Sequence, residues 1–235
     1  MTQAPAQVFA ANFLANLAAL AEVRHVYLAP GARSQALAVA AEQLASAGRI
    51  KLHVRIDERS MAFTALGTAL ATQTPVALIT TSGTAVANLH PAVLEAHHSG
   101  VPLILLTADR PAELRGVGAN QTTEQVGIFG AAVPMVFDVE APEPNVDEAQ
   151  RAVELAQAVS ASLRSNSGPV QVNLAFREPL SSALPDAAKI EVLEKAVDDE
   201  SPELDWAILD ATVPTVVIAG AGAGEDAVEL AESFG

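Results

Sequence analysis

The sequence predicts an α/β fold, a doubly wound and mainly parallel sheet with helices on both faces. Short apolar runs typical of buried strands alternate about six times with amphipathic or alanine-rich segments typical of helices. The strand runs are continuously apolar, as expected for a parallel sheet that is covered on both faces. Aromatic residues make up only 4% of the chain, whereas alanine and valine abound, which suits helices packed closely on a sheet.

The first half of the chain contains three expected helices and two expected strands. Apolar residues at helical spacing over residues 7–23 predict an amphipathic helix. A short apolar strand at 25–29 leads through a Pro-Gly turn into a helix that ends near residue 47. Residues 51–56 alternate as a strand does, and they turn directly into an alanine-rich helix over 59–71.

The second half continues the alternation. A buried strand over residues 76–80 precedes a helix over 85–98, and a fully apolar strand over 101–107 follows. The polar loop over 108–123 is too long for an ordinary connection, so it is a candidate for function. A short helix near residues 124–129, a strand over 135–139, a helix over 146–163 and a strand over 170–174 complete the expected elements.

We expect three parts in the chain: a domain over residues 1–185, an acidic linker over 186–211, and the start of a second α/β domain over 212–235. Residues 186–210 hold nine acids and two bases. A strand expected at 215–219 precedes several glycines, but Glu225 stands where the dinucleotide-binding pattern needs glycine. One strand and one helix cannot bury their own faces, so we expect a longer protein.

Composition narrows the classes of partner and compartment. The net charge of −15 disfavours nucleic acids and anionic membranes as partners. The chain has no cysteine, which excludes disulfides, thiolate nucleophiles and cysteine-ligated metals. The N-terminal residues lack the pattern of a signal peptide, and no apolar run reaches the length of a membrane span. We therefore expect a cytoplasmic protein.

Polar clusters follow four of the expected strands. They lie at residues 30–34, 57–60, 81–84 and 108–123. In parallel α/β sheets, ligands bind beyond the carboxyl ends of the strands. We therefore expect these four clusters to face one crevice and to form an active site.

Glu58 stands where the expected strand over 51–56 turns into the expected helix over 59–71. Two interpretations of this junction remain open from the residues alone. Asp57 or Ser60 can cap the helix, and an acid in the first turn is favoured by the helix dipole. Alternatively, Glu58 is a functional carboxylate held at a fixed orientation.

Several arginines accompany the strand ends of this acidic chain: Arg33, Arg59, Arg110 and Arg115. A surface salt bridge is the ordinary role of any one of them. A group of guanidinium side chains around one crevice suggests an anionic substrate, because guanidinium binds carboxylates through two parallel hydrogen bonds. Asn120 and Gln121 could add neutral donors or could simply form turns.

Other chemistry fits the sequence less well. Ser82 is not in a nucleophile elbow, since Thr80 and Thr84 occupy the positions that need glycine. His97 and His98 are adjacent and would point about 100° apart on a helix, so they cannot chelate one ion together. We assign no metal ligand within this chain.

Four motifs together carry a resemblance. They lie at residues 29–34, 57–60, 81–88 and 106–121. In this order they resemble the N-terminal pyrimidine-binding domain of a thiamin-diphosphate-dependent family, the 2-succinyl-5-enolpyruvyl-6-hydroxy-3-cyclohexene-1-carboxylate synthases of menaquinone biosynthesis. The resemblance covers about residues 8–180. The wider thiamin-diphosphate family shares the fold and the glutamate but not the Gly-Ala-Asn-Gln run at 118–121.

The resemblance implies a transferase that decarboxylates 2-oxoglutarate and adds the succinyl-semialdehyde carbanion to isochorismate. Glu58 matches the family's catalytic glutamate, which hydrogen-bonds the pyrimidine ring of the cofactor. The remaining residues implied are Thr81, Ser82 and Gly83 beside the pyrimidine, and Arg33, Arg110, Asn120 and Gln121 at the substrates. Ala32 stands where the family usually has serine, so a hydroxyl contact to the substrate is in doubt there.

The resemblance also implies what lies elsewhere. Family members bind the diphosphate and Mg²⁺ through a Gly-Asp-Gly motif and a later asparagine in a C-terminal domain, and no such motif occurs in these 235 residues. That domain comes from the other subunit of a dimer, so we expect half a cofactor site here, an inactive fragment, and a homodimer or homotetramer at full length. Two alternatives are an acetohydroxyacid-synthase-like carboligase and a non-catalytic dimerisation or regulatory domain.

Overall fold

The computed structural model describes residues 3–180, 182–183, 185, 190–194, 216, 220 and 224–234. The chain divides into two compact units, Met1–Lys195 and Ala196–Gly235. Within the described residues, the second unit contains one helix, α7 (Glu225–Phe234). Apart from Val216, the strand expected at 215–219 lies outside the described residues, as does most of the expected linker, so the domain boundaries stay predictions.

The first unit is built on a sheet of six parallel strands. Their bounds are β1 (His25–Leu28), β2 (Lys51–Val54), β3 (Val76–Thr80), β4 (Leu103–Asp109), β5 (Val136–Val139) and β6 (Val170–Ala175). The strand order is β2-β1-β3-β4-β6-β5, and all five pairings are parallel. The predicted fold class is confirmed.

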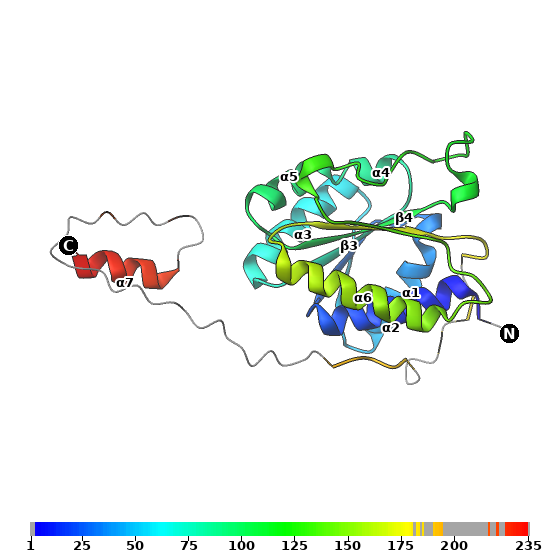
Figure 1. Cartoon of the computed structure of the whole chain (residues 1–235), viewed down its shortest axis with the longest axis horizontal. Coiled ribbons are helices and arrows are strands. Elements are labelled where there is room, and N and C mark those ends of the chain that lie inside the picture. Colours follow the sequence, from blue (N-terminus) through cyan, green and yellow to red (C-terminus); the bar gives the residue numbers. More distant parts are fainter. Residues whose placement is uncertain are drawn as a thin grey trace. The chain divides into compact units, whose positions relative to one another are not determined.

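Helices cover both faces of this sheet, as Figure 1 shows. One layer consists of α1 (Pro5–Leu20), α2 (Gln35–Ser46) and α6 (Glu148–Ser165). The other consists of α3 (Glu58–Thr72), α4 (Thr84–Ala87) and α5 (His90–His98). Each layer buries its own apolar cluster against the sheet. Short 3₁₀ turns are η1 (Ala32–Ser34), η2 (Ala112–Leu114) and η3 (Gly130–Ala132).

Burial along the strands follows their place in the sheet. Every residue of β3, β4 and β6 is buried, because both faces of these central strands are covered. The edge strands β2 and β5 are only partly buried, and for β2 this agrees with the alternation expected over residues 51–56. The expectation of continuously apolar strands is wrong for β5, which contains Asp138, and for β6, which buries Gln171 and Asn173.

Two predicted helices differ in the structure. The single helix expected over residues 85–98 is two helices, α4 and α5, with Pro91 in the first turn of α5. Proline lacks an N–H and its ring clashes with the preceding turn, so one continuous helix cannot run through it. The helix expected near 124–129 is absent; Glu124 and Gln125 are irregular, residues 126–129 form turns, and Gly127 has a φ of +68°.

The strand order places the candidate loops. In the sheet, β2 lies on one side of β1. β3 lies on the other side of β1, and β4, β6 and β5 follow it in that direction. The loops after β1 and β3 therefore leave the sheet at its topological switch point, where α/β sheets open a crevice for ligands. The loop after β4 is next to them, because Thr80, the last residue of β3, pairs with Thr107, two residues before the end of β4.

Candidate functional site

The start of α3 separates the roles of two adjacent acids. Asp57 is the N-cap residue, and its Oδ1 accepts a hydrogen bond from the Ser60 N–H at 2.7 Å. Glu58 is the first residue of the helix and is half-buried. Its carboxylate forms no hydrogen bond or ion pair with any described residue. The cap is therefore supplied by Asp57, and Glu58 remains available to a ligand.

The loops after β1 and β3 pack directly on each other. A Cβ atom added at Gly31 would lie 2.3 Å from Thr81 Cβ, a distance that side chains cannot adopt. Gly31 has an extended backbone, with a φ of −172°, so close approach is the reason for glycine here. Gly83 has a φ of +82°, and a Cβ there would lie 3.1 Å from the carbonyl oxygen of Gln121.

The long loop after β4 folds back onto the loop after β3. Ser82 Oγ donates to the carbonyl oxygen of Gln121 at 3.0 Å, and Gln121 Nε2 donates to the carbonyl oxygen of Ser82 at 3.1 Å. The Arg110 guanidinium donates to Ser82 Oγ and, at 2.6 Å, to the Gln121 carbonyl. Gln121 adopts a left-handed φ of +55° in this arrangement. Such strained backbone recurs at ligand sites.

Arg33 and Arg110 lie close enough to affect each other. The Arg33 side chain is 12% exposed and donates to the carbonyl oxygen of Phe176 at 2.8 Å. Burial lowers the pKa of Arg33, and the charge of Arg110 lowers it further. The nearest carboxylate to Arg33 is that of Glu178 at 3.9 Å, which is largely exposed to solvent. The charges of Glu178 and Asp109 act in the opposite direction, but only that of Glu178 lies within 4 Å of Arg33. Two neighbouring guanidinium groups without a close buried carboxylate favour an anion there.

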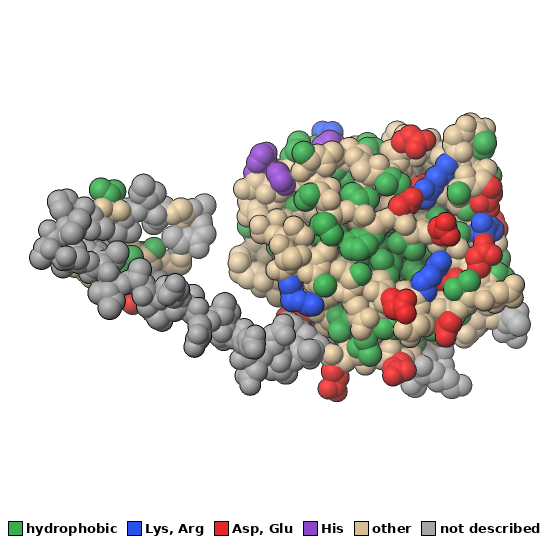
Figure 2. All heavy atoms as spheres, viewed as in Figure 1, with side chains coloured by type: hydrophobic (Ala, Val, Ile, Leu, Met, Phe, Trp, Pro, Cys, Tyr) green, Lys and Arg blue, Asp and Glu red, His purple; other side chains and the backbone are tan. Residues whose placement is uncertain are grey.

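Arg115 and Arg177, in contrast, are neutralised by carboxylates. Arg115 contacts the buried carboxylate of Asp109 at 3.1 Å and that of Asp138 at 2.9 Å. Arg177 bridges Glu113 and Glu143, and its hydrogen bonds lower the pKa of Glu113 to about 2. On the face in Figure 2, basic side chains likewise lie beside acidic ones. The predicted role of Arg115 at an anion is thus replaced by a structural one.

The structure brings together five of the eight residues predicted for the site. Ser82, Gly83, Arg110 and Gln121 touch one another, and Arg33 lies near Arg110. Thr81 is beside them and packs on Gly31. Asn120 is exposed and only its carbonyl oxygen is hydrogen-bonded, by Thr122 Oγ1. Glu58 lies at the same edge of the sheet, after β2, without contacting this group.

Buried polar atoms lack partners at this edge. Thr80 Oγ1, Thr81 Oγ1 and Arg33 Nε are buried and have no hydrogen-bond partner among the described residues. Buried polar groups in proteins are nearly always satisfied. Three unsatisfied atoms, one at the end of β3 and two in the loops after β1 and β3, therefore indicate that a polar ligand or another part of the protein completes this region.

Gln125 is a residue of the site that sequence reasoning missed. Its side chain is 1% exposed, and its Oε1 accepts a hydrogen bond from the Gly83 N–H at 2.7 Å. Its Nε2 donates to the carbonyl oxygen of Ala108 and to Asn173 Oδ1. The available signal was a pair of amides, Gln171 and Asn173, alternating on a strand that is otherwise apolar.

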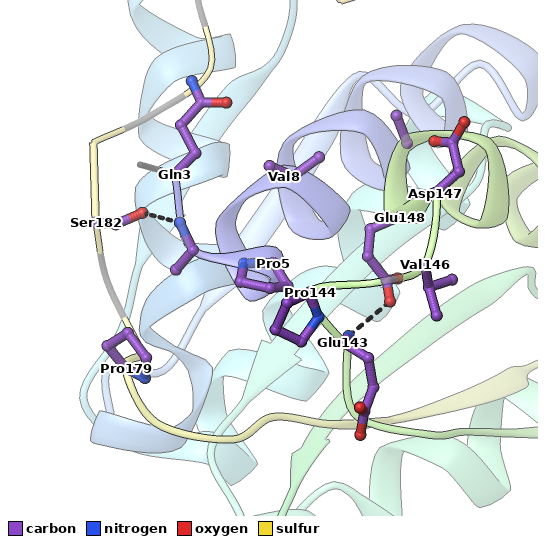
Figure 3. Close-up of a pocket in the computed structure, with 12 residues that line it drawn as sticks. Gln3, Pro5, Val8, Glu143, Pro144, Val146, Asp147, Glu148, Pro179 and Ser182 are labelled. Carbon is purple, nitrogen blue, oxygen red and sulfur yellow. Dashed lines mark hydrogen bonds between the residues drawn. The ribbon is translucent and has the colours of Figure 1, made fainter. Parts of the chain in front are cut away.

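A cavity of about 660 Å³ lies apart from these residues, between the N-terminal ends of α1 and α6 (Figure 3). Its polar lining includes Glu143, Asp147 and Glu148, and no lysine or arginine lines it. Glu148 accepts a hydrogen bond from the Glu143 N–H, which Figure 3 marks. None of the residues predicted for the site lines this cavity, and its acidic lining does not suit a carboxylate substrate.

The strand order and the strand-end loops define a parallel α/β domain that binds a ligand at its topological switch point. A family model described as the thiamine pyrophosphate enzyme, N-terminal TPP binding domain, matches residues 9–128. The chain belongs to this family.

Curated relatives extend the similarity to most of the chain. Three of them are 2-succinyl-5-enolpyruvyl-6-hydroxy-3-cyclohexene-1-carboxylate synthases from different bacteria. That of Leifsonia xyli subsp. xyli is 50% identical over 98% of this chain and 40% of the relative. That of Paenarthrobacter aurescens is 50% identical over 91% of this chain and 38% of the relative. That of Clavibacter michiganensis is 55% identical over 71% and 28%, respectively. The chain thus spans about two-fifths or less of these relatives.

Among the described residues, no helix is both long enough and apolar enough to cross a membrane.

Proposed function

We propose that this chain is the N-terminal part of a thiamin-diphosphate-dependent synthase that decarboxylates 2-oxoglutarate and adds the succinyl unit to isochorismate in menaquinone biosynthesis. The observation that carries the proposal is the free carboxylate of Glu58 at the first turn of α3, in a chain whose relatives bear the name of that synthase. The chain alone holds part of the site, so we propose that activity requires the remainder of the protein.

The residues at the switch point fit the pyrimidine end of the cofactor. When bound, thiamin diphosphate supplies the carbon nucleophile and stabilises the negative charge that decarboxylation leaves. Glu58 would hydrogen-bond a ring nitrogen and hold a proton there, because its carboxylate has no other partner. The unsatisfied hydroxyl of Thr81, with Ser82 and Gly83, would border the ring. The diphosphate and Mg²⁺ would be held by the remainder of the protein.

The substrates are rich in carboxylates, which suits the cationic side of the site. Arg33 and Arg110 would bind and orient these groups, since guanidinium pairs with carboxylates in a planar geometry. Gln121 keeps Arg110 in place through its carbonyl oxygen. Asn120 is exposed and could donate to substrate from the same loop. Ala32 is exposed and brings no hydroxyl to this side.

The assembly we propose is a homodimer in the cytoplasm, in which the partner completes the site near Glu58. Large apolar side chains close to Glu58 in the chain are exposed: Val54 at the end of β2, Ile56 in the connection to α3, which is 84% exposed, and Phe63 in α3. Large apolar side chains grouped at one edge typically mark an interaction surface.

Glu58→Gln tests the proposal in the protein that carries this domain together with the remaining length of its relatives. We expect product formation from 2-oxoglutarate and isochorismate to fall by about 100-fold or more, because an amide cannot share a proton with the pyrimidine. Glu95→Gln, an exposed change on α5, is the matched control and should leave the rate unchanged. Activity of Glu58→Gln close to that of Glu95→Gln would remove Glu58 from this role.

A further inference from the structure

We propose that Gln125 is a positioning residue that holds the loops after β3 and β4 in register at the site. The inference rests on the proposed function, because it concerns the same cofactor and substrate groups. Gln125 does not face the ligand region itself. It is buried, and its side-chain amide joins the loop after β3 to the strands β4 and β6.

The three bonds of the Gln125 amide reach the loop after β3 and the strands β4 and β6. Oε1 accepts from the N–H of Gly83, which follows β3, at 2.7 Å. Nε2 donates to the carbonyl oxygen of Ala108 in β4 at 3.3 Å and to Asn173 Oδ1 in β6 at 3.0 Å. A buried backbone N–H without a partner is strongly unfavourable, so the position of Gly83 follows that of Gln125 Oε1.

A chain of hydrogen bonds from two ion-paired carboxylates fixes which way this amide points. Asp109 and Asp138 are ion-paired carboxylates that only accept hydrogen bonds, and both accept from Asn173 Nδ2, at 3.0 and 2.9 Å. Asn173 must therefore present Oδ1 to Gln125, and Gln125 must present Nε2 in return. Its Oε1 is then left to face Gly83.

The consequence reaches the substrate side through one peptide. Gly83 follows Ser82, whose hydroxyl contacts both the guanidinium of Arg110 and the carbonyl oxygen of Gln121. Displacing Gly83 moves Ser82, and with it the anchor of Arg110. Ala108 lies in β4, two residues before Arg110. The bond from Gln125 Nε2 to the Ala108 carbonyl oxygen therefore holds the start of the loop that carries Arg110. Gln125 thus sets the distance between the two loops that would border cofactor and substrate.

The test uses the protein that carries this domain and the remaining length of its relatives. Gln125→Met keeps the shape of the side chain and removes all three hydrogen bonds. Gln7→Met is the matched control, because Gln7 is a fully buried glutamine that bonds to Ala36 between α1 and α2. Gln125→Glu is the rescue variant: its carboxylate still accepts from Gly83 but cannot donate to Asn173.

Two quantities are measured, the hydrogen exchange of the Gly83 amide and the calorimetric affinity for thiamin diphosphate. We expect Gly83 to be protected in the wild type and to exchange at least about tenfold faster in Gln125→Met, with cofactor affinity weakened about 10- to 100-fold. Gln7→Met should change neither. Gln125→Glu should be less stable than the wild type yet keep Gly83 protected. If Gln125 had a purely structural role, the protection of Gly83 would fall together with stability.

Fast exchange of Gly83 in the wild type would overturn the inference, and so would equal affinities for Gln125→Met and Gln7→Met. If Gln125→Met does not fold, the wild-type exchange and Gln125→Glu still decide the matter. Failure of the wild type to bind thiamin diphosphate would count against the proposed function instead, while the exchange comparison still shows whether Gln125 positions the loop.

Discussion

Asp57 Oδ1 accepts a 2.7 Å hydrogen bond from the backbone N–H of Ser60, and this contact caps α3. The Ser60 hydroxyl also donates to the Asp57 carbonyl oxygen at 3.1 Å. The two residues thus complete the helix start without using Glu58. Asp57 thus stabilises the helix, whereas Glu58 remains available for ligand binding. The sequence alone leaves open which acid has which role.

The cap can be tested separately from the ligand role. Asp57→Ala should lower the melting temperature of the protein by a few degrees, because the Ser60 N–H loses its acceptor. Asp57→Ser retains an acceptor and should recover most of the loss. Glu58→Gln should lower the melting temperature by less than Asp57→Ala in the absence of cofactor, because it keeps the cap and removes only the favourable charge in the first turn. The measurement is thermal denaturation of each variant. An equal loss of stability for Glu58→Gln and Asp57→Ala would contradict the assignment of the cap to Asp57 alone.

A histidine pair at the edge of the sheet predicts a dependence of stability on pH. His25 Nδ1 and His53 Nε2 lie 3.0 Å apart, and Tyr27 stacks on His53. Burial lowers the pKa of both imidazoles from the usual 6.5; Lys51 lowers that of His25 further, and His25, Arg55 and Lys51 lower that of His53. The unfolded chain therefore binds more protons than the folded protein just below pH 6.5.

The sign follows from these lowered pKa values. Above pH 6.5 both imidazoles are neutral in either state, and stability is complete with respect to them. As the pH falls below 6.5, the unfolded state gains protons first, so stability declines until the folded-state pKa values are reached. We expect the melting temperature to fall between pH 7 and pH 5, and His53→Phe, which keeps the stacking, to flatten that decline. A decline of the same slope in His53→Phe would assign the pH dependence to other groups.

The elements set by local pattern could be predicted, whereas contacts across the fold could not. The periodicity of the chain sufficed for the parallel sheet and for the helices at residues 7–23 and 59–71, because these depend on which face is apolar. The break between α4 and α5 was also available, since Pro91 stands in the sequence. The helix expected near 124–129 failed for a different reason.

In that segment the side chain of Gln125 bonds to Gly83, 42 residues earlier in the chain, and to Asn173, 48 residues later. Tertiary hydrogen bonds of this kind override local helix propensity, and a window of sequence does not contain them. The same limit applies to the site. Residue type could suggest Arg33 and Arg115 alike for an anion, but only the fold places Asp109 and Asp138 against Arg115.

The close packing of Gly31 on Thr81 predicts that any side chain at position 31 destabilises the contact between the loops after β1 and β3. A methyl group at this position would overlap Thr81 Cβ and both of its branches, at 2.3 to 2.6 Å. We expect Gly31→Ala to lower the free energy of unfolding by about 1–3 kcal/mol. Thr81→Gly in the same chain should recover part of the loss, because it removes the atoms that collide. Gly67→Ala, which meets no atom within 4 Å, is the control.

Denaturant unfolding of both single variants and of the double variant gives the three losses of stability. If the losses of Gly31→Ala and Thr81→Gly are additive, the two positions are independent, which would contradict the close contact.

The hydrogen bonds of Asn16 in α1 predict that this side chain holds residues 190–194 against the rest of the first unit. Asn16 is fully buried; its Nδ2 donates to the carbonyl oxygen of Glu191 at 3.1 Å, and its Oδ1 accepts from the Leu193 N–H at 2.9 Å. One side chain thus satisfies the backbone of this segment in the way that a neighbouring strand would. Asn16→Leu should lower the free energy of unfolding by about 1–3 kcal/mol, because it leaves both backbone groups unpaired.

The local effect should be larger than the global one. The Leu193 amide should exchange rapidly in Asn16→Leu while the amides of β3 and β4 remain protected, since those strands lie in the centre of the sheet. Asn12→Leu is the control, because Asn12 bonds only to the Val8 carbonyl within α1 and accepts from Asn16 through its own backbone. Unchanged exchange at Leu193 in Asn16→Leu would mean that the apolar contacts of Ile190 and Val192 hold the segment without the asparagine.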